Sequence, residues 1–242
     1  MRATTGTTAR EAELPYEAAG GEKLRVVSLP NGEGLAAHRA AWWELAAAAC
    51  EANVFYEPFL LEPAIAELRG ASRLEIVLVY DDGAGQAGRL LGLFPLERRG
   101  ASLRRPVPSL VLWKHLHCFL CTPLVREDGG VAALEAFFAW LERHAGAARW
   151  MGFEHVTADG PFARLLGAAL ARRPRRIVET ERFERAFAEM ADCADDYLRA
   201  AVPRKRSHDI ERRARRLGEQ GDLRIRLVAP GLCDHLDGAL DA

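Results

Sequence analysis

Residues 74–96 read LEIVLVY, DDGAGQAG and RLLGLFPL, and this stretch decides the fold class. Its first and third segments, 74–80 and 89–96, are apolar and rich in residues that favour strands. The Gly-rich segment between them is typical of a turn, so the pattern predicts an antiparallel hairpin. Because helical spacing precedes and follows the hairpin, we expect a mixed sheet rather than the regular alternation of a doubly wound parallel fold.

Helices and strands are expected on both sides of this hairpin. Before it, the pattern predicts a strand, a helix, an aromatic loop and a second helix, at 24–29, 34–51, 53–58 and 59–68. After it, the pattern predicts two strands, a helix, a buried strand, a helix and an extended segment, at 109–113, 117–125, 131–141, 150–154, 161–171 and 177–187. This order indicates a mixed α/β fold with α+β character.

The composition is that of a globular protein with balanced charge. Of the 242 residues 49% are apolar, and 33 Lys and Arg nearly cancel 34 Asp and Glu. This excludes a disordered chain or a collagen-like fibre, and it provides no overall field that would attract nucleic acid. No apolar stretch is long enough for a membrane span, and no secretory signal segment is expected. Five cysteines, an odd number, favour a reducing compartment, so we expect a cytoplasmic protein.

Changes in character along the chain predict four segments. Residues 1–22 lack periodicity and predict a disordered tail, and residues 23–190 would form the first domain. Residues 191–221 would form a basic helical linker, in which one helix precedes Pro203 and a second follows it. Residues 222–242 predict one strand and the start of a helix, too little to bury a core, and so the start of a truncated second domain.

Two motifs in the first domain invite a binding interpretation. Gly83-x-Gly85-x-x-Gly88 matches a dinucleotide fingerprint, but a strand follows where a helix is needed, so a hairpin turn is favoured. On a strand, His115 and His117 would share one face with Trp113, and Cys118 would point to the other. That alternation predicts no metal site. The stripe would line a substrate pocket, or its histidines would be satisfied inside the sheet.

Two further segments carry candidate residues. Tyr56-Glu57-Pro58 is typical of a capping turn, although it could also border a cleft. In the basic helix, Ile210, Ala214 and Leu217 form one stripe, and the opposite face is either solvated or binds anions such as the phosphates of CoA or RNA. The candidate anion-binding residues are Arg204, Lys205, Arg212, Arg215 and Arg216. No aromatic residues interleave with them, so nucleic acid is not the expected partner.

The order of several short motifs resembles a known family. These motifs are Trp42-Trp43-x-Leu45, Asn53-x-Phe55, Leu93-Phe94-Pro95-Leu96, His115-x-His117, Thr122-Pro123-Leu124-Val125, Tyr197-Leu198, Arg204-Lys205-Arg206 and Ile210-x-Arg212-Arg213-x-x-Arg216-Leu217. Together they resemble the CelD/BcsL-like acetyltransferases associated with cellulose biosynthesis. That group belongs to the GNAT superfamily and is related in architecture to the FemABX aminoacyl transferases. The resemblance covers residues 24–242.

This resemblance implies a tandem pair of GNAT-like domains, of which the chain holds the first and the truncated start of the second. It implies acetyl-CoA or another acyl-CoA as donor, and a small molecule or polysaccharide precursor as acceptor. In the family a Gln/Arg-x-x-Gly-x-Gly/Ala loop receives the CoA pyrophosphate. We find neither that loop nor any Gly-rich loop that opens a helix in this sequence, and Arg98-Arg99-Gly100-Ala101 does not fit. The chain by itself is therefore expected to be inactive.

Acyl transfer to an amine needs a base and a proton donor. The candidate bases are Glu57, His115 and His117, and the candidate proton donor is Tyr56. The residues that could instead bind the acceptor are Tyr56, Trp113, His115 and His117. Two other functions stay open. One is a non-catalytic GNAT-like binding or scaffold module. The other is a FemABX-like transferase that uses aminoacyl-tRNA.

Overall fold

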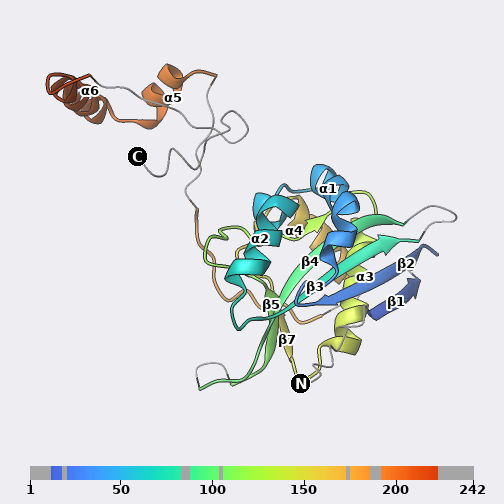
Figure 1. Cartoon of the computed structure of the whole chain (residues 1–242). Coiled ribbons are helices and arrows are strands. Elements are labelled where there is room, and N and C mark those ends of the chain that lie inside the picture. The colour runs from blue at the N-terminus through green and yellow to red at the C-terminus, as the bar shows by residue number, and fades with distance from the viewer. Residues whose placement is uncertain are drawn as a thin grey trace, which may run out of the picture. The chain divides into compact units, whose positions relative to one another are not determined.

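The computed structural model describes residues 12–17, 21–82, 88–103, 106–172, 175–185 and 192–222. The chain divides into two compact units, Met1–Ile177 and Val178–Ala242 (Figure 1). The sequence placed this boundary at residue 190. The described residues of 177–185 form no strand and are exposed.

One mixed sheet organises the first unit. Its order is β1-β2-β3-β4-β5-β7, and β6 also pairs with β4. All neighbours are antiparallel except β5 and β7, which are parallel. The strands are β1 (Ala12–Glu17), β2 (Lys23–Pro30), β3 (Arg73–Asp81), β4 (Arg89–Arg99), β5 (Ser109–Leu112), β6 (Leu124–Val125) and β7 (Trp150–Gly152). The predicted hairpin is confirmed as β3 and β4, and the fold is mixed α/β as expected.

Four predictions about extended segments need correction. The expected tail contains β1, whose backbone pairs with β2 from Ala12 to Glu17. The strand expected at 117–125 is limited to β6. The strand expected to be buried at 150–154 is short, and Trp150 is 45% exposed at the end of the sheet. No strand lies in the described part of 177–187.

Helices cover both faces of the sheet. α1 and α2 lie on one face and α3 lies on the other, with α4 packed against α3 (Figure 1). The predicted helices are confirmed, and short 3₁₀ turns precede the first two of them. The helical elements of this unit are η1 (Leu35–His38), α1 (Arg39–Ala48), η2 (Val54–Tyr56), α2 (Pro58–Leu68), α3 (Gly130–His144) and α4 (Pro161–Arg172).

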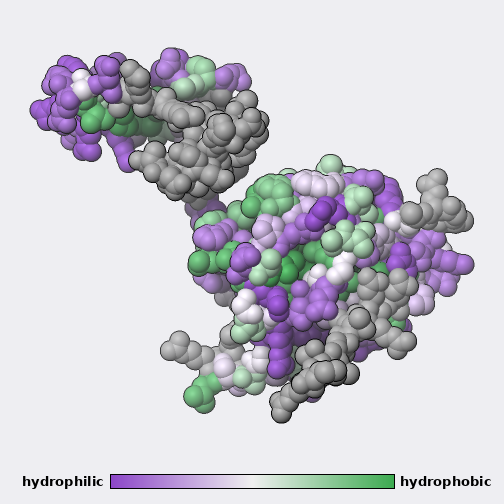
Figure 2. Space-filling model, in the orientation of Figure 1, coloured by the Kyte–Doolittle hydropathy of each residue, from purple (hydrophilic) through white to green (hydrophobic). Residues whose placement is uncertain are grey.

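Aromatic side chains fill the two layers between helices and sheet. Phe94 of β4 stacks on Phe137 of α3, with ring centroids 4.0 Å apart. On the other face, the indole of Trp42 in α1 is fully buried and donates a hydrogen bond of 2.8 Å to the Tyr56 carbonyl. Trp43 and Phe59 stack on the outer side of α1 and α2, where hydrophobic patches interrupt the hydrophilic surface (Figure 2).

The second unit contains two helices in its described residues. α5 spans Ala194–Ala201 and α6 spans Arg204–Gly218, with Pro203 at the cap between them, as the sequence predicted. Neither helix has a buried residue, and Ile210 and Leu217 are each 52% exposed. The strand and helix predicted within 222–242 lie outside the described residues, which end at Asp222.

Gly92 is required where β4 meets α3. The register between β3 and β4 shifts beside it, and a Cβ at this position would lie 2.8 Å from Cε2 of Phe94. The Phe94 ring has no room to move because it stacks on Phe137. We therefore expect Gly92→Ala to lower the free energy of unfolding by about 1–3 kcal/mol, the usual cost of overpacking. Urea unfolding followed by tryptophan fluorescence measures this.

Gly167→Ala is the matched control. Gly167 lies inside α4, and a Cβ there meets nothing within 4 Å. Because glycine in a helix interior costs about 0.5–1 kcal/mol relative to alanine, this variant should be more stable than the parent chain. A Gly92→Ala variant as stable as Gly167→Ala would contradict the tight packing of Phe94.

Candidate functional site

The chain leaves the sheet between β5 and β6, and this departure defines the first candidate site. Leu112 pairs with Leu96 of β4 and Leu124 pairs with Leu93. Between these two pairings β4 has two residues, whereas the chain from β5 to β6 has eleven. The extra residues, 113–123, are called the excursion loop below. It contains the two histidines and two cysteines considered in the sequence analysis, which are His115, His117, Cys118 and Cys121.

The predicted stripe of Trp113, His115 and His117 is wrong. The excursion loop is not a strand, so its side chains do not alternate between two faces. His115 is only 7% exposed, whereas His117 is exposed. The backbone N–H of His117 donates to Nδ1 of His115 at 3.3 Å, and that of Cys118 donates to the His115 carbonyl at 3.0 Å. His115 therefore orders a tight turn.

The segment before α2 holds both ends of the excursion loop. The buried amide of Asn53 donates to the carbonyls of Leu120 and Thr122, at 3.1 and 2.8 Å. Its Oδ1 accepts from the backbone of Phe55 at 3.1 Å. The hydroxyl of Tyr56 donates to the Trp113 carbonyl at 2.7 Å. These bonds satisfy backbone carbonyls that would otherwise be buried without a partner.

Tyr56 does not fit the role of proton donor to a substrate. Its side chain is fully buried, and this burial raises the pKa of its hydroxyl well above the usual value. The hydroxyl proton of Tyr56 is already donated to the carbonyl of Trp113. Tyr56-Glu57-Pro58 forms the turn into α2: Glu57 stands at the N-cap position without a side-chain capping bond, and Pro58 begins the helix.

A carboxylate missed from the sequence joins three loops. Oε1 of Glu51 accepts hydrogen bonds from the hydroxyls of Thr122, at 3.4 Å, and Thr157. Its Oε2 is buried and abuts Gly160, where a Cβ would overlap it. No local pattern could identify this contact, because Thr122 and Thr157 lie 71 and 106 residues along the chain from Glu51.

These loops meet beyond the carboxyl ends of the parallel strands β5 and β7. In open sheets with parallel strands this end commonly binds ligands. Here it is occupied by the excursion loop, whose Cys121 N–H donates to the His155 carbonyl at 3.0 Å. Within the described residues, no hydrogen bond runs from one side chain to another among Tyr56, Glu57, His115 and His117. The candidate base and donor are therefore not paired in this chain.

Two glycines do open a helix, contrary to the expectation from the sequence. Gly129 caps α3 with a φ of 82°, and Gly130 begins the helix. A Cβ at Gly129 would lie 3.2 Å from Leu91, and one at Gly130 would lie 2.8 Å from Leu165. Apolar side chains thus crowd this helix end. Two carboxylates, Glu127 and Asp128, precede it and disfavour an anion. The glycines serve packing and do not cradle a diphosphate.

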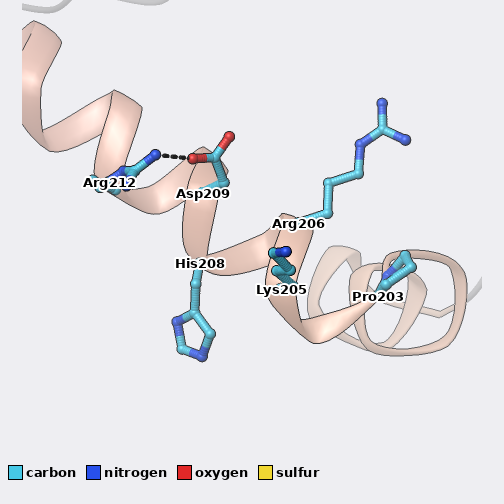
Figure 3. A pocket seen from close by; sticks show the side chains of 6 residues that line it. All are labelled: Pro203, Lys205, Arg206, His208, Asp209 and Arg212. Carbon is cyan, nitrogen blue, oxygen red and sulfur yellow. Dashed lines mark hydrogen bonds and ion pairs between the residues drawn. The ribbon is translucent and has the colours of Figure 1, made fainter.

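The second candidate site is the cationic face of α6. Asp209 accepts ion pairs from Arg212 and, at 2.9 Å, from Arg213. A shallow pocket on this helix is lined by Pro203, Lys205, Arg206, His208, Asp209 and Arg212, and Figure 3 shows Arg212 turned toward Asp209. No ion pair within the described residues engages the remaining cations, which are Arg204, Lys205, Arg206, Arg215 and Arg216. Among the five residues predicted to bind anions, Arg212 therefore already has a counter-ion, the carboxylate of Asp209.

Within the described ranges, no three His, Cys, Asp or Glu side chains gather as a metal site would require. No helix in the same ranges has the length and apolar character to cross a bilayer. No family model and no curated protein sequence matches this chain.

The Tyr56 hydrogen bond generates a stability prediction. Tyr56→Phe leaves the Trp113 carbonyl buried without its donor, which should lower the free energy of unfolding by about 1–3 kcal/mol. Tyr16→Phe is the control, because the half-buried Tyr16 hydroxyl makes no hydrogen bond in the described part. It should change stability by less than about 0.5 kcal/mol. Equal stability of the two variants in urea would show that Tyr56 does not hold the loop.

His115 generates a pH prediction. Burial, together with the charges of His117 and Lys114, lowers the pKa of His115. A histidine whose pKa is lower in the folded than in the unfolded chain stabilises the fold above about pH 6.5, and this contribution is lost as the pH falls. Unfolding free energies measured from pH 7 to 5 should fall less steeply for His115→Gln than for the parent chain. His117→Gln should reduce the slope by less than His115→Gln does, because it removes only one of the charges that lower the pKa of His115.

Proposed function

We propose that this chain belongs to an acyl-CoA-dependent N-acyltransferase of the GNAT type. The observation that carries the proposal is the set of cations on α6 without carboxylate partners, in the segment where the family resemblance is densest. Such cations suit phosphate groups, which prefer charge-assisted hydrogen bonds from Arg. The mixed sheet of the first unit, with helices on both faces, supports the GNAT-like fold that the resemblance implies.

The described residues fit one end of an acyl-CoA. Arg204, Lys205, Arg215 and Arg216 would hold its phosphates, and the bound cofactor would supply an acyl group activated as a thioester. Within the first unit, His117 and Glu57 remain the candidate bases, since their side chains reach the surface at least in part. His115 and Tyr56 would position the excursion loop, because both are used inside it.

A non-catalytic binding module is the second candidate. It is favoured by the internal use of Tyr56 and His115, because in the described part of the chain none of Glu57, His115 and His117 pairs with the Tyr56 hydroxyl as base and donor. A FemABX-like transferase would instead use the cations of α6 for tRNA, and its binding would weaken steeply with salt.

Titration calorimetry on the full chain tests the acyl-CoA proposal. Adenosine 3′,5′-bisphosphate, which carries the phosphate end of CoA, should bind at low salt with a Kd of about 1 mM. Arg215→Gln with Arg216→Gln should weaken this binding about tenfold, a loss of roughly 1.4 kcal/mol. Arg212→Gln with Arg213→Gln removes the same charge but changes only arginines that pair with Asp209, so it should bind like the parent chain.

The alternatives predict different results. Equal weakening by both double variants would indicate a general charge effect and contradict the proposed phosphate site. Tighter, salt-sensitive binding of tRNA would favour the aminoacyl-tRNA function. Micromolar binding of acetyl-CoA with thiol release on adding an amine would show a complete active site, and the expectation that the chain by itself is inactive would be wrong.

A further inference from the structure

The excursion loop contains a pair of thiols that the proposed acyl transfer does not use. Cys118 and Cys121 are both fully buried, and their sulfur atoms lie 3.8 Å apart within hydrogen-bond reach. The Sγ of Cys118 also lies 3.1 Å from the Leu120 carbonyl. The pair has the Cys-x-x-Cys spacing that is common in redox-active dithiols.

We propose that Cys118 and Cys121 form a redox dithiol that a small disulfide such as oxidised glutathione converts into an intramolecular disulfide. A disulfide needs the two sulfurs at about 2.05 Å, so they must approach each other by roughly 1.8 Å. The two residues are three apart in a loop, which makes this approach a local change. The proposal is independent of the acyltransferase function.

The exchange balances in two steps. The Cys118 thiolate attacks one sulfur of oxidised glutathione, the glutathione disulfide bond breaks, and one glutathione leaves as a thiolate that takes up a proton. Cys121, after losing its proton to solvent, attacks the Cys118 sulfur of the mixed disulfide, and the second glutathione leaves. Two protein thiols are oxidised to one disulfide, and one oxidised glutathione is reduced to two thiols.

The surroundings assign the first attack to Cys118. The two sulfurs lie within hydrogen-bond reach, and a bond in which Cys121 is the donor would lower the pKa of Cys118 and raise that of Cys121. Lys114 adds a positive charge that favours the Cys118 thiolate. A thiol with a lowered pKa is the better nucleophile at neutral pH.

The loop also provides a route to the buried sulfur. His117 and Phe119, on either side of Cys118, are exposed, and the turn that carries Cys118 is closed by the local bond to the His115 carbonyl. Cys121 lies in the anchored end, between Leu120 and Thr122, whose carbonyls Asn53 holds. Opening of the turn therefore exposes Cys118 first, while Cys121 stays in place to resolve the mixed disulfide.

The experiment uses the folded full chain in buffers of oxidised and reduced glutathione. After an acid quench, peptide mapping by mass spectrometry should find a peptide cross-linked between Cys118 and Cys121, which dithiothreitol reverses. In Cys121→Ser the reaction should stop at a glutathione adduct on Cys118. The matched control replaces the other three cysteines, Cys50, Cys193 and Cys233, with serine, and should form the cross-link as the parent chain does.

Oxidation of the parent chain tests the proposal even if a variant fails to fold. Oxidation that modifies the exposed Cys193 while Cys118 and Cys121 stay reduced would overturn it. So would a cross-link that forms only after unfolding in urea, since the folded loop would then play no part. Adducts on Cys118 that never resolve in the parent chain would likewise exclude the dithiol.

Discussion

The hydrogen bonds from Asn53 and Tyr56 to the excursion loop are the constraint on which the candidate site depends. A chain that leaves the middle of a sheet takes backbone carbonyls away from their ladder partners, and buried carbonyls need donors. The Asn53 amide and the Tyr56 hydroxyl supply three of these donors, at Trp113, Leu120 and Thr122. Without these donors, the three carbonyls would be buried without a hydrogen-bond partner.

This constraint also decides the chemistry of the loop. It turns the chain so that His115 and both cysteines face inward while His117 faces solvent. A residue type that would serve as a base on an open strand becomes part of the fold, and two ordinary thiols become neighbours at 3.8 Å. The same bonds therefore weaken the case for a catalytic histidine pair and create a dithiol.

The two units divide the protein's chemistry between them. In the described residues of the first unit, Asn53 and Tyr56 donate hydrogen bonds to the excursion loop, and Glu51 joins three loops. The described helices of the second unit bury nothing and carry a cationic face that is only partly neutralised by Asp209. We therefore propose an anion-binding face on α6 and a redox dithiol in the excursion loop.

The sequence by itself determined the β3–β4 hairpin, the helices and the cap at Pro203, because strand and helix periods and turn residues are local signals. Only the tertiary structure decided where the strand at 109–125 breaks, since the pattern from Trp113 to Cys121 is equally compatible with an extended strand. It also decided that Ala12–Glu17 pairs with β2, and that Glu51 meets Thr122 and Thr157. These outcomes depend on partners distant in the chain, which no local period encodes.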